Sequence, residues 1–327
     1  MLAARRRRVF VTGGAGFIGS HVVDRLLADG HQVTVYDNLS SGKRSRVKSH
    51  YSSSSFSFVE GDILDLVRLS EACRGQDVVW HLAANTDIRA GTRTTDIDLR
   101  LGVIGTCNVL EAMRLNGVEQ IMFASSGVVY GDFDANPLLE TAGPLLPTSL
   151  YGAGKLSGEA FVSAYCHLFG IRAWIFRFAN IIGGRTDHGV VYDFVQKLRR
   201  NPNELEVLGD GKQMKPYLLV DECVRGMLHA FEVLPMTEGS PCDVFNLSTD
   251  SFASVERIAT IVIEEMGLGG VKIRYTGGRR GWLGDAPVIL LGAEKMRGAG
   301  WVAAHSSEQA VRLAAREIIS GRSMAAD

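Results

Sequence analysis

Short apolar segments alternate with helical ones through the first half of this chain, and that alternation limits the folds open to it. The apolar segments are rich in Val, Ile and Phe, as strands buried on both faces of a sheet are. They lie at 7–13, 32–37, 56–62, 77–84, 120–126 and 171–178, and helical patterns lie at 17–29, 65–73, 97–116 and 150–169. Strand, helix and strand in succession imply parallel pairing through right-handed crossovers. We therefore predict an α/β fold with a doubly wound parallel sheet.

The alternation breaks after residue 180. Glycine and turn residues become denser in "NIIGGRTDHG", "VLGDGKQ" and "TGGRRGWLGD", and the remaining segments are short and irregularly spaced. We predict a first domain over 1–180 and a smaller C-terminal domain over 181–327, some of whose segments can return to the first sheet.

The charge balance gives no electrostatic reason for a nucleic-acid or membrane partner. The 327 residues are 46% hydrophobic and 22% charged, with a formal net charge of -1 and a pI of about 6.7. The one basic cluster, Arg5 to Arg8, directly precedes "VFVTG". We interpret it as the solvated start of the first strand, with a nucleic-acid-binding arm as the alternative.

The cysteines indicate neither a disulfide framework nor a metal site. Cys73, Cys107, Cys166, Cys223 and Cys242 are odd in number and far apart, and no C-x-x-C pair accompanies them. They are typical of core residues in a reducing compartment. No apolar run approaches the roughly 18 residues that span a bilayer, and no leader-type segment begins the sequence. We expect a cytoplasmic protein.

A glycine motif follows the first strand directly. In "VFVTGGAGFIGSHVVDRLLADG", Gly13, Gly16 and Gly19 have the spacing that permits a tight turn, close approach of the backbone to a pyrophosphate, and close packing of helix on sheet. The following helix begins with free N–H groups that can face phosphates. With a strand before it and a helix after it, the motif predicts a dinucleotide site.

The second strand ends in Asp37, 18 residues after Gly19. A carboxylate there can accept hydrogen bonds from both ribose hydroxyls and repels a 2′-phosphate, so NAD is favoured over NADP. Lys43 and Arg44 lie beyond that turn and keep NADP open as the alternative.

Tyr151 and Lys155 stand one helical turn apart in "SLYGAGKLSGEAF". A free tyrosine has a pKa of about 10 and a free lysine about 10.4, so neither is a base at neutral pH. A fixed cation beside the phenol favours its ionised form. On the pair alone, a half-buried tyrosine beside a surface lysine remains the alternative.

Together these segments resemble the extended short-chain dehydrogenase/reductase family, and within it the nucleotide-sugar epimerases. The matching stretches are "VTGGAGFIGSH", "YDNLSSGKR", "GDILD", "WHLAA", "FASSGVVYGD", "LYGAGK" and "RFAN", with weaker ones at "EVLGDGKQ" and "RGWLGD". The resemblance implies a Rossmann domain followed by a substrate domain. It also implies bound NAD and a UDP-sugar substrate.

The resemblance assigns residues to three roles. The catalytic set is Ser126, Tyr151 and Lys155. The cofactor set is Gly13, Gly16, Phe17, Ile18, Gly19, Asp37, Asn38, Ser41, Gly42, Asp62, Ile63, Leu82, Ala83, Ala84, Tyr151 and Lys155. The substrate set is Ser125, Ser126, Asn180, Arg185, Gly189, Val190, Leu208, Lys215, Arg280 and Asp285.

Two departures from the family pattern affect these assignments. Gly102 stands where the family often has an Asn near the cofactor, and Lys215 replaces a diphosphate-binding Arg. A lysine supplies charge but no bidentate fork. Arg280 is the candidate for that fork, with Asp285 at the uridine ribose, and a surface ion pair between them is the alternative.

The residues after Ser126 discriminate among the family's reactions. Its dehydratases and decarboxylases carry acidic residues there, whereas this chain has Gly127, Val128 and Val129, which cannot transfer a proton. We therefore expect epimerisation at C4 through a transient 4-keto sugar. Other oxidoreductase or dehydratase activity on a nucleotide sugar, and a non-catalytic NAD-binding scaffold, remain the alternatives.

The sugar stays open between UDP-glucose, UDP-glucuronate and N-acetylated sugars. Arg185 and His188 lie where a C6 group can reach, and an arginine suits a carboxylate. A solvated loop arginine is the equal alternative. Family members pair through helices matching 97–116 and 150–169, so a homodimer is expected.

Overall fold

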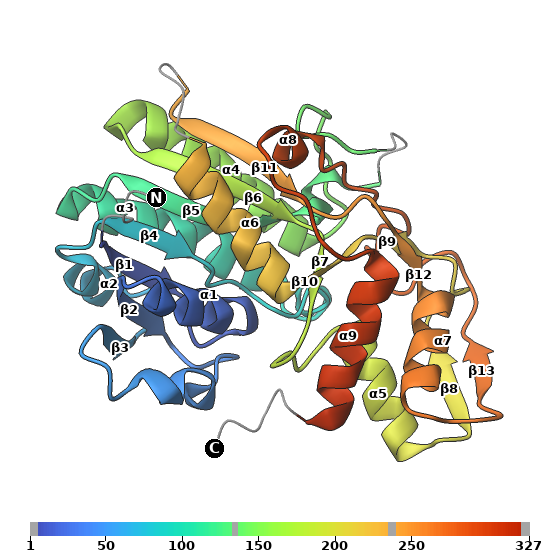
Figure 1. The fold of residues 1–327 in the computed structure, drawn as a ribbon. Helices are drawn as coiled ribbons and strands as arrows, with labels where there is room; N and C mark the ends of the chain where they lie inside the picture. Colours follow the sequence, from blue (N-terminus) through green and yellow to red (C-terminus); the bar gives the residue numbers. More distant parts are fainter. Residues whose placement is uncertain (1–5, 133–136, 235–239, 322–327) are drawn as a thin grey trace. The chain divides into compact units, whose positions relative to one another are not determined.

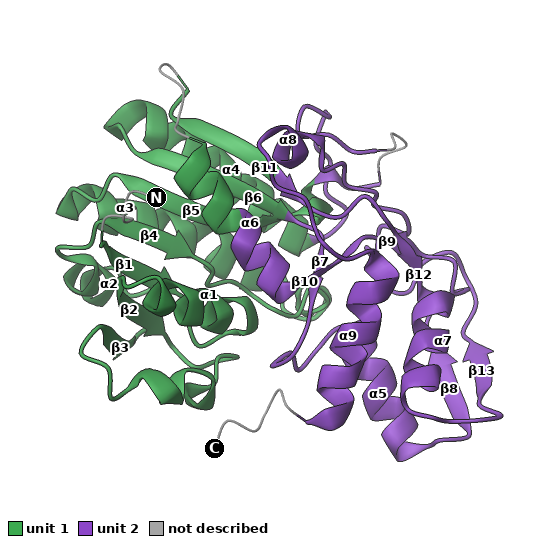
Figure 2. Ribbon diagram, in the orientation of Figure 1, with its two compact units in different colours: residues 1–129, 150–177, 227–245 green, residues 130–149, 178–226, 246–327 purple. Residues whose placement is uncertain are grey.

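The chain forms two compact units, each built from three stretches of sequence (Figure 2). The computed structural model describes residues 6–132, 137–234 and 240–321. Unit 1 comprises 1–129, 150–177 and 227–245, and unit 2 comprises 130–149, 178–226 and 246–327. Unit 2 thus includes 130–149, which the prediction placed in the first domain, and unit 1 includes 227–245, which the prediction placed in the second.

Unit 1 contains a seven-stranded sheet in the order β11-β6-β5-β4-β1-β2-β3 (Figure 1). The strands are β1 (Arg8–Thr12), β2 (Gln32–Asp37), β3 (Phe56–Glu60), β4 (Val78–His81), β5 (Gln120–Ser126), β6 (Arg172–Phe178) and β11 (Cys242–Leu247). The pairs β1–β2, β1–β4, β2–β3 and β4–β5 are parallel. The predicted doubly wound sheet is confirmed, and six of its strands lie within the predicted ranges. No strand was predicted at the position of the seventh, β11, which comes from the part of the chain whose segments were expected to be able to return to this sheet.

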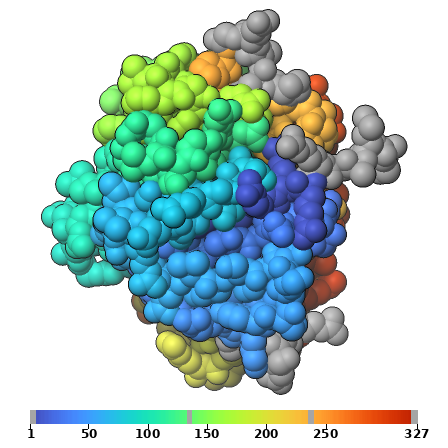
Figure 3. Space-filling model, turned by 90° about the vertical axis from the view of Figure 1, so that its left-hand side faces the viewer, coloured from blue at the N-terminus to red at the C-terminus, as the bar shows by residue number. Residues whose placement is uncertain are grey.

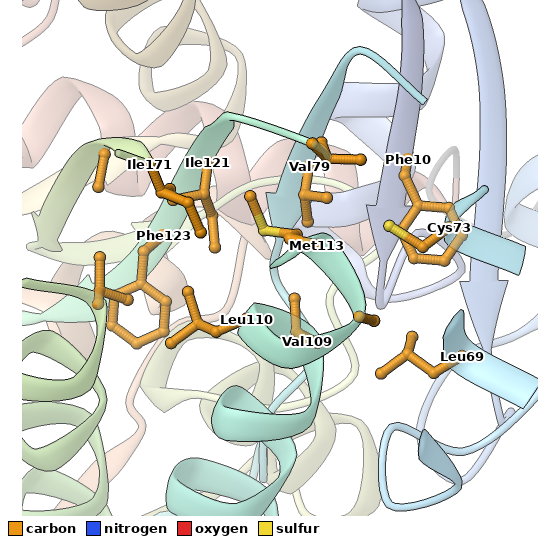
Figure 4. Close-up of a cluster of buried hydrophobic side chains, with 14 of the residues drawn as sticks. Phe10, Leu69, Cys73, Val79, Val109, Leu110, Met113, Ile121, Phe123 and Ile171 are labelled. Atoms are coloured by element: carbon orange, nitrogen blue, oxygen red, sulfur yellow. The ribbon is translucent and has the colours of Figure 1, made fainter. Parts of the chain in front are cut away.

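Helices cover both faces of this sheet. They are α1 (Phe17–Ala28), α2 (Leu66–Cys73), α3 (Gly105–Asn116), α4 (Leu150–Phe169) and the second part of α6 (Val220–Val233), with short 3₁₀ helices at Arg44–His50, Ala90–Thr92 and Gly127–Tyr130. Successive side chains of a strand point to opposite faces. Phe10, Val79 and Phe123 therefore pack with α2, α3 and α4 (Figure 4). On the opposite face, the rings of Trp80 and Trp174 meet Phe231 of α6 edge to face.

The predicted helix at 97–116 is a π-helix over Leu99–Ile104 followed by α3. Glycines occupy two positions at which this segment packs closely. A Cβ on Gly102 would lie 3.2 Å from the Cα of Gly154 in α4, and one on Gly105 would lie 2.4 Å from the Ile63 side chain. The wider π turn is typical of helices near functional sites.

Unit 2 combines short strand pairs with longer helices. Its strands are β7 (Asn180–Ile182), β8 (Glu204–Val207), β9 (Met214–Lys215), β10 (Tyr217–Leu219), β12 (Ala253–Ser254) and β13 (Lys272–Tyr275), paired as β10–β7, β12–β9 and β13–β8. Its helices are α5 (Val190–Arg200), the first part of α6, α7 (Val255–Glu265), α8 (Glu294–Gly298) and α9 (Ser307–Ser320). Apolar side chains of α5, α7 and α9 form one buried core, which includes Phe194, Ile258 and Val311.

The described arginines of the basic cluster contact other residues of unit 1. Arg7 stacks on the ring of Phe231 at 4.5 Å and donates to Gln120, and Arg8 pairs with Asp77 at the start of β1; Arg5 lies outside the described residues. Figure 3 shows a face of the molecule on which residues of the first half of the chain, blue to teal, form most of the surface. Within 6–132, 137–234 and 240–321, no helix has the length and apolarity to cross a membrane.

Candidate active site

Unit 1 has a hollow beyond the carboxyl ends of β1, β2 and β4. In this topology the strand order reverses between β1 and β4, and ligands bind at such a switch point. The hollow has a volume of about 510 Å³ including its open mouth. It is lined by Gly13, Gly16, Tyr36, Asp37, Asn38, Ser40, Ser41, Gly42, Gly61, Ile63, Leu82, Ala83, Ala84, Thr86 and Leu101.

Ten of these lining residues belong to the cofactor set assigned from the sequence. Phe17, Ile18, Gly19, Asp62, Tyr151 and Lys155 belong to that set but not to the lining. Sequence reasoning missed Tyr36, Ser40, Gly61, Thr86 and Leu101. Ser40 stands inside the quoted "YDNLSSGKR" and Gly61 opens "GDILD", so the motifs contained both residues. Leu101 carried no comparable signal.

The turn after β1 requires glycine at two points. Gly13 has φ +71, and a Cβ there would lie 2.7 Å from the backbone N of Ala83. A Cβ on Gly19 would lie 2.1 Å from the carbonyl oxygen of Gly13. The loop therefore packs without side chains between β4 and α1, and Gly16 is the N-cap of α1 without a side-chain cap. This cradle, together with a free helix N-terminus, fits the pyrophosphate of NAD.

Asp37 lies at the end of β2, on the wall of the hollow. Its carboxylate accepts the N–H groups of Ala15 at 2.9 Å and Leu39 at 2.8 Å. Burial raises the pKa of the Asp37 carboxyl, and these two hydrogen bonds oppose the rise. A Cβ on Gly42 would lie 2.6 Å from one of its oxygens, so the turn leaves this side of Asp37 clear. Each carboxylate oxygen keeps a lone pair for a ribose hydroxyl.

Asn38 and Asp62 are joined beside the hollow. The Asn38 amide donates to Asp62 at 3.0 Å, and the other carboxylate oxygen of Asp62 accepts from the N–H of Leu64 at 2.9 Å. The Tyr36 hydroxyl donates to the Asp62 carbonyl at 3.0 Å. The ends of β2 and β3 thus hold one another in place at Asn38 and Asp62, two residues of the cofactor set.

Lys155 is buried against the end of β5. Its side chain comes from α4 and its Nζ donates to the carbonyl of Ala124 at 2.6 Å. The Nζ also lies 5.3 Å from the centre of the Phe123 ring and 5.8 Å from the centre of the Tyr151 ring. Burial lowers the pKa of Lys155 to about 8, although the carboxylates of Asp98 and Glu159 favour its charged form.

Tyr151 differs from what the sequence suggested. Burial raises its pKa to about 12, and the Asp98 carboxylate adds to the rise. In the protein without cofactor, the cation of Lys155 therefore does not produce a phenolate. Ser126, the third catalytic candidate, ends β5, and its hydroxyl oxygen accepts from the N–H of Val128 at 3.4 Å.

Asp98 is a charged residue near this site that the sequence did not single out. It is 3% exposed, and one carboxylate oxygen accepts from the Asn85 amide at 3.0 Å. The other oxygen has no hydrogen-bond partner among the described residues. Burial raises the pKa of Asp98. A Cβ on Gly154 would lie 2.9 Å from the Asp98 carbonyl, so this residue packs against the helix that carries Tyr151 and Lys155.

His81, in "WHLAA", does not serve as a base here. Its ring lies between the hydroxyls of Thr12 at 2.7 Å and Thr106 at 3.2 Å. Burial lowers the pKa of His81 to about 3, and the charge of Lys155 adds to the effect. The ring is therefore neutral and fully engaged at physiological pH.

Ser125, assigned to the substrate set, is 2% exposed. Its hydroxyl donates to Oε1 of Glu159 at 2.5 Å. Arg177 donates to both oxygens of the same carboxylate, at 3.0 and 2.7 Å. No sequence pattern indicated this buried group, because Ser125 and Arg177 are 34 and 18 residues from Glu159.

Unit 2 brings four of the substrate candidates together. Lys215 pairs with Asp285 at 2.6 Å, and Asp285 also accepts from the N–H of Gly281 at 3.2 Å. Arg280 donates to the carbonyl of Asp285 at 2.5 Å and to the carboxylate of Asp132 at 2.7 Å. A Cβ on Gly281 would lie 3.9 Å from the Leu208 side chain. Lys215 rather than Arg280 is thus the ionic partner of the Asp285 carboxylate.

The other substrate candidates in unit 2 lie along one stretch of chain. Asn180 begins β7, and its amide donates to the carbonyl of Pro216 at 3.2 Å, next to Lys215. Arg185 follows in the loop to α5 and has φ +66, a strained conformation for a residue with a side chain. Gly189 caps α5 with φ +92, and Val190 is its first residue. His188 is exposed and contacts Asp187 at 3.2 Å.

Over the parts of the chain that the structure describes, no group of three or more His, Cys, Asp or Glu side chains could hold a metal ion.

The model of the NAD dependent epimerase/dehydratase family matches residues 9–246. A putative UDP-glucose 4-epimerase of Methanocaldococcus jannaschii is 33% identical over 300 residues, which cover 90% of this chain and 92% of that protein.

Two further matches show how the likeness extends. UDP-glucuronic acid decarboxylase 2 of Arabidopsis thaliana is 32% identical over 265 residues, 79% of this chain and 56% of that protein. A crystal structure of a UDP-galactose 4-epimerase is 39% identical, with a TM-score of 0.86, and the match covers 96% of this chain and 99% of that one.

Proposed function

This chain belongs to the NAD-dependent epimerase/dehydratase family, and from that premise we propose that it inverts C4 of a UDP-sugar. The substrate pair is UDP-glucose with UDP-galactose, or UDP-glucuronate with UDP-galacturonate. Unit 1 holds NAD in the hollow lined by Gly13 and Asp37, and unit 2 supplies residues that bind the sugar nucleotide.

The observation that carries the proposal is the run that follows Ser126. Gly127, Val128 and Val129 have no group that can donate or accept a side-chain proton, and Val129 is fully buried. Elimination of water needs groups that remove and donate a proton beside the reacting sugar, and the enolate left when the carboxyl group departs as carbon dioxide needs a proton donor there. C4 inversion needs only the base that removes and returns the proton of the C4 hydroxyl, so it is the reaction these residues favour.

Three side chains of unit 1 perform the proton chemistry. NAD held in that hollow would supply a reversible hydride acceptor for C4, and its positive charge would favour the phenolate of Tyr151. Tyr151 takes the C4 hydroxyl proton. Because burial raises the pKa of its phenol, Tyr151 can act as this base only when the added positive charge offsets the effect of burial. Lys155 keeps its place on the Ala124 carbonyl and presents a cation to the phenol ring. Ser126 donates a hydrogen bond to the sugar oxygen.

The nucleotide end of the substrate meets the charged group of unit 2. Lys215 provides a cation for the diphosphate, and Asp285 orients that lysine at 2.6 Å. Arg280 lies beside them, with one guanidinium nitrogen on the Asp285 carbonyl and another on the Asp132 carboxylate. Arg185 is the residue proposed to read a C6 carboxylate.

The test is product analysis without added NAD. The purified protein is incubated with UDP-glucose, UDP-glucuronate and UDP-N-acetylglucosamine in separate reactions, and the sugars are separated by chromatography. Inversion at C4 with any of them supports the proposal, and the substrate turned over identifies the sugar. A product that has lost carbon dioxide would make the chain a decarboxylase, as some of its relatives are. If the protein retained NAD but formed no product in any reaction, the remaining interpretation would be a non-catalytic NAD-binding scaffold.

We also propose that two copies of the chain associate through the π-helix, α3 and α4. Large apolar side chains are exposed on these segments: Leu99, Ile104, Leu115, Leu150, Phe161, Leu168 and Phe169. Exposed apolar groups gathered on neighbouring helices mark interaction surfaces. Sedimentation velocity of the wild type and of Leu168→Glu tests this, because a buried charge should shift the chain to monomer. Monomeric wild type at micromolar concentration would contradict the proposal.

A further inference from the structure

Side chains from two successive turns of α4 form hydrogen bonds with the last residues of β5. Lys155 donates to the carbonyl of Ala124 at 2.6 Å, and Glu159, one turn later, accepts the hydroxyl of Ser125 at 2.5 Å. The helix comes close enough for this because Gly158 has no side chain, since a Cβ there would lie 2.7 Å from the Phe123 ring. The next residue of β5 is Ser126, and the preceding turn of α4 carries Tyr151. These two hydrogen bonds therefore connect the two backbone segments that carry the reacting groups.

Arg177 holds the carboxylate of Glu159, which accepts the hydrogen bond from Ser125. It comes from β6, the neighbour of β5 in the sheet, and grips both oxygens of Glu159 at 3.0 and 2.7 Å. The side chains of Arg177 and Glu159 are 5% and 7% exposed. A bidentate pair of this kind fixes the orientation of the carboxylate as well as its charge. Glu159 Oε1 then accepts from Ser125 in one defined direction.

This arrangement gives Ser125 a role different from substrate binding. Its hydroxyl is buried and already donates its only proton to an ionised partner, so none remains for a sugar oxygen. A buried ion pair is weak support for stability but can fix one arrangement among several. Catalytic groups must be held to within a fraction of an ångström to react efficiently.

We propose that Ser125, Glu159 and Arg177 are positioning residues of the reaction, which hold Ser126 in register with Tyr151 and Lys155. The inference rests on the proposed C4 inversion. It predicts that loosening the Ser125 contact slows turnover while substrate affinity stays the same, because none of the three side chains touches the substrate.

The test compares two serine-to-alanine variants. Ser125→Ala removes the hydroxyl but leaves the Glu159–Arg177 pair intact, and adds no volume. Ser157→Ala is the matched control: Ser157 lies on the same helix, and its hydroxyl donates to the Ala153 carbonyl at 2.8 Å, not to β5. For each variant, kcat and KM are measured on the UDP-sugar that the wild type turns over, and retained NAD is determined after denaturation.

For Ser125→Ala we expect kcat to fall by about 10- to 100-fold, as when a charge-assisted hydrogen bond is lost, with KM and NAD content within about twofold of the wild type. Ser157→Ala should match the wild type. A rise in KM larger than the fall in kcat would make Ser125 a substrate contact, and wild-type kinetics would make its hydrogen bond purely structural. Either result overturns the inference.

Failure of the proposed function would look different, because the wild type itself would then invert no UDP-sugar. In that case the crystal structures of the wild type and Ser125→Ala, both with NAD, decide the question. A displaced Ser126 relative to Tyr151 supports positioning, and an unmoved Ser126 overturns it.

Discussion

Replacing Lys155 by methionine should change how the stability of the protein depends on pH. Lys155 is 5% exposed, and burial lowers the pKa of its ammonium group from 10.5 to about 8. The folded chain therefore releases this proton at a lower pH than the unfolded chain does. Between pH 8 and 10.5 the unfolded state binds more protons, so the free energy of unfolding of the wild type rises with pH over that window.

The size of the effect follows from the two pKa values. A shift of the Lys155 pKa from 10.5 to about 8 corresponds to about 3 kcal/mol in the free energy of unfolding. The wild type is less stable by this amount below pH 8 and recovers it by about pH 10.5. Lys155→Met has a similar length and no charge, so its stability lacks this dependence. Because the pKa of Tyr151 is raised to about 12, its contribution to the free energy of unfolding falls as the pH rises above 10. This happens in both proteins, so the contribution largely cancels when they are compared.

The assay is urea unfolding of cofactor-stripped protein, followed by tryptophan fluorescence from pH 7 to 10.5. The difference in free energy of unfolding, variant minus wild type, should decline by about 3 kcal/mol across that range. The same variant should retain little NAD. A difference that stays constant with pH would show that Lys155 is not held at a cost by burial, and the account of its pKa would be refuted.

Three further predictions test the site residues. Tyr151→Phe should keep the fold and NAD but lower epimerisation by at least roughly 10²–10⁴-fold, the range for loss of a general base; near wild-type isotope exchange at C4 would make Tyr151 a packing residue. Asp37→Ala should lose the preference for NAD over NADP, measured by titration of stripped protein, and tight NADP binding by the wild type would contradict its role. Arg185→Ala should lower turnover of UDP-glucuronate by roughly 10- to 150-fold more than that of UDP-glucose. Equal losses on both sugars would show that Arg185 reads no carboxylate.

Local sequence patterns predicted the fold class and six of the seven strands of unit 1, because those strands are continuous apolar runs and the glycine turn follows β1 directly. Many of the residues that line the hollow were assigned through the family resemblance instead. Unit 2 was harder to predict. Its helices α5, α7 and α9 form one core from segments far apart, and the spacing of the short strands between them follows no simple period.

The contacts that the sequence did not predict join distant residues. Lys215 and Asp285 are 70 residues apart, and Ser125 and Glu159 are 34 apart. The pKa of Tyr151 depends on burial and on Asp98, neither of which the i and i+4 spacing of Tyr151 and Lys155 reveals. Propensity and spacing describe one element at a time, whereas electrostatics and partner choice come from how the elements pack.

The sheet of unit 1 is completed by a strand that the ribosome makes late. β6 ends at Phe178, but its edge neighbour β11 begins only at Cys242, and Phe231, which covers Trp80 and Trp174, also follows a long stretch of unit 2. At roughly 5–20 residues per second, the nascent chain carries an unpaired strand edge for several seconds. A fragment ending near residue 180 would keep that edge permanently and should aggregate instead of folding as an independent nucleotide-binding module.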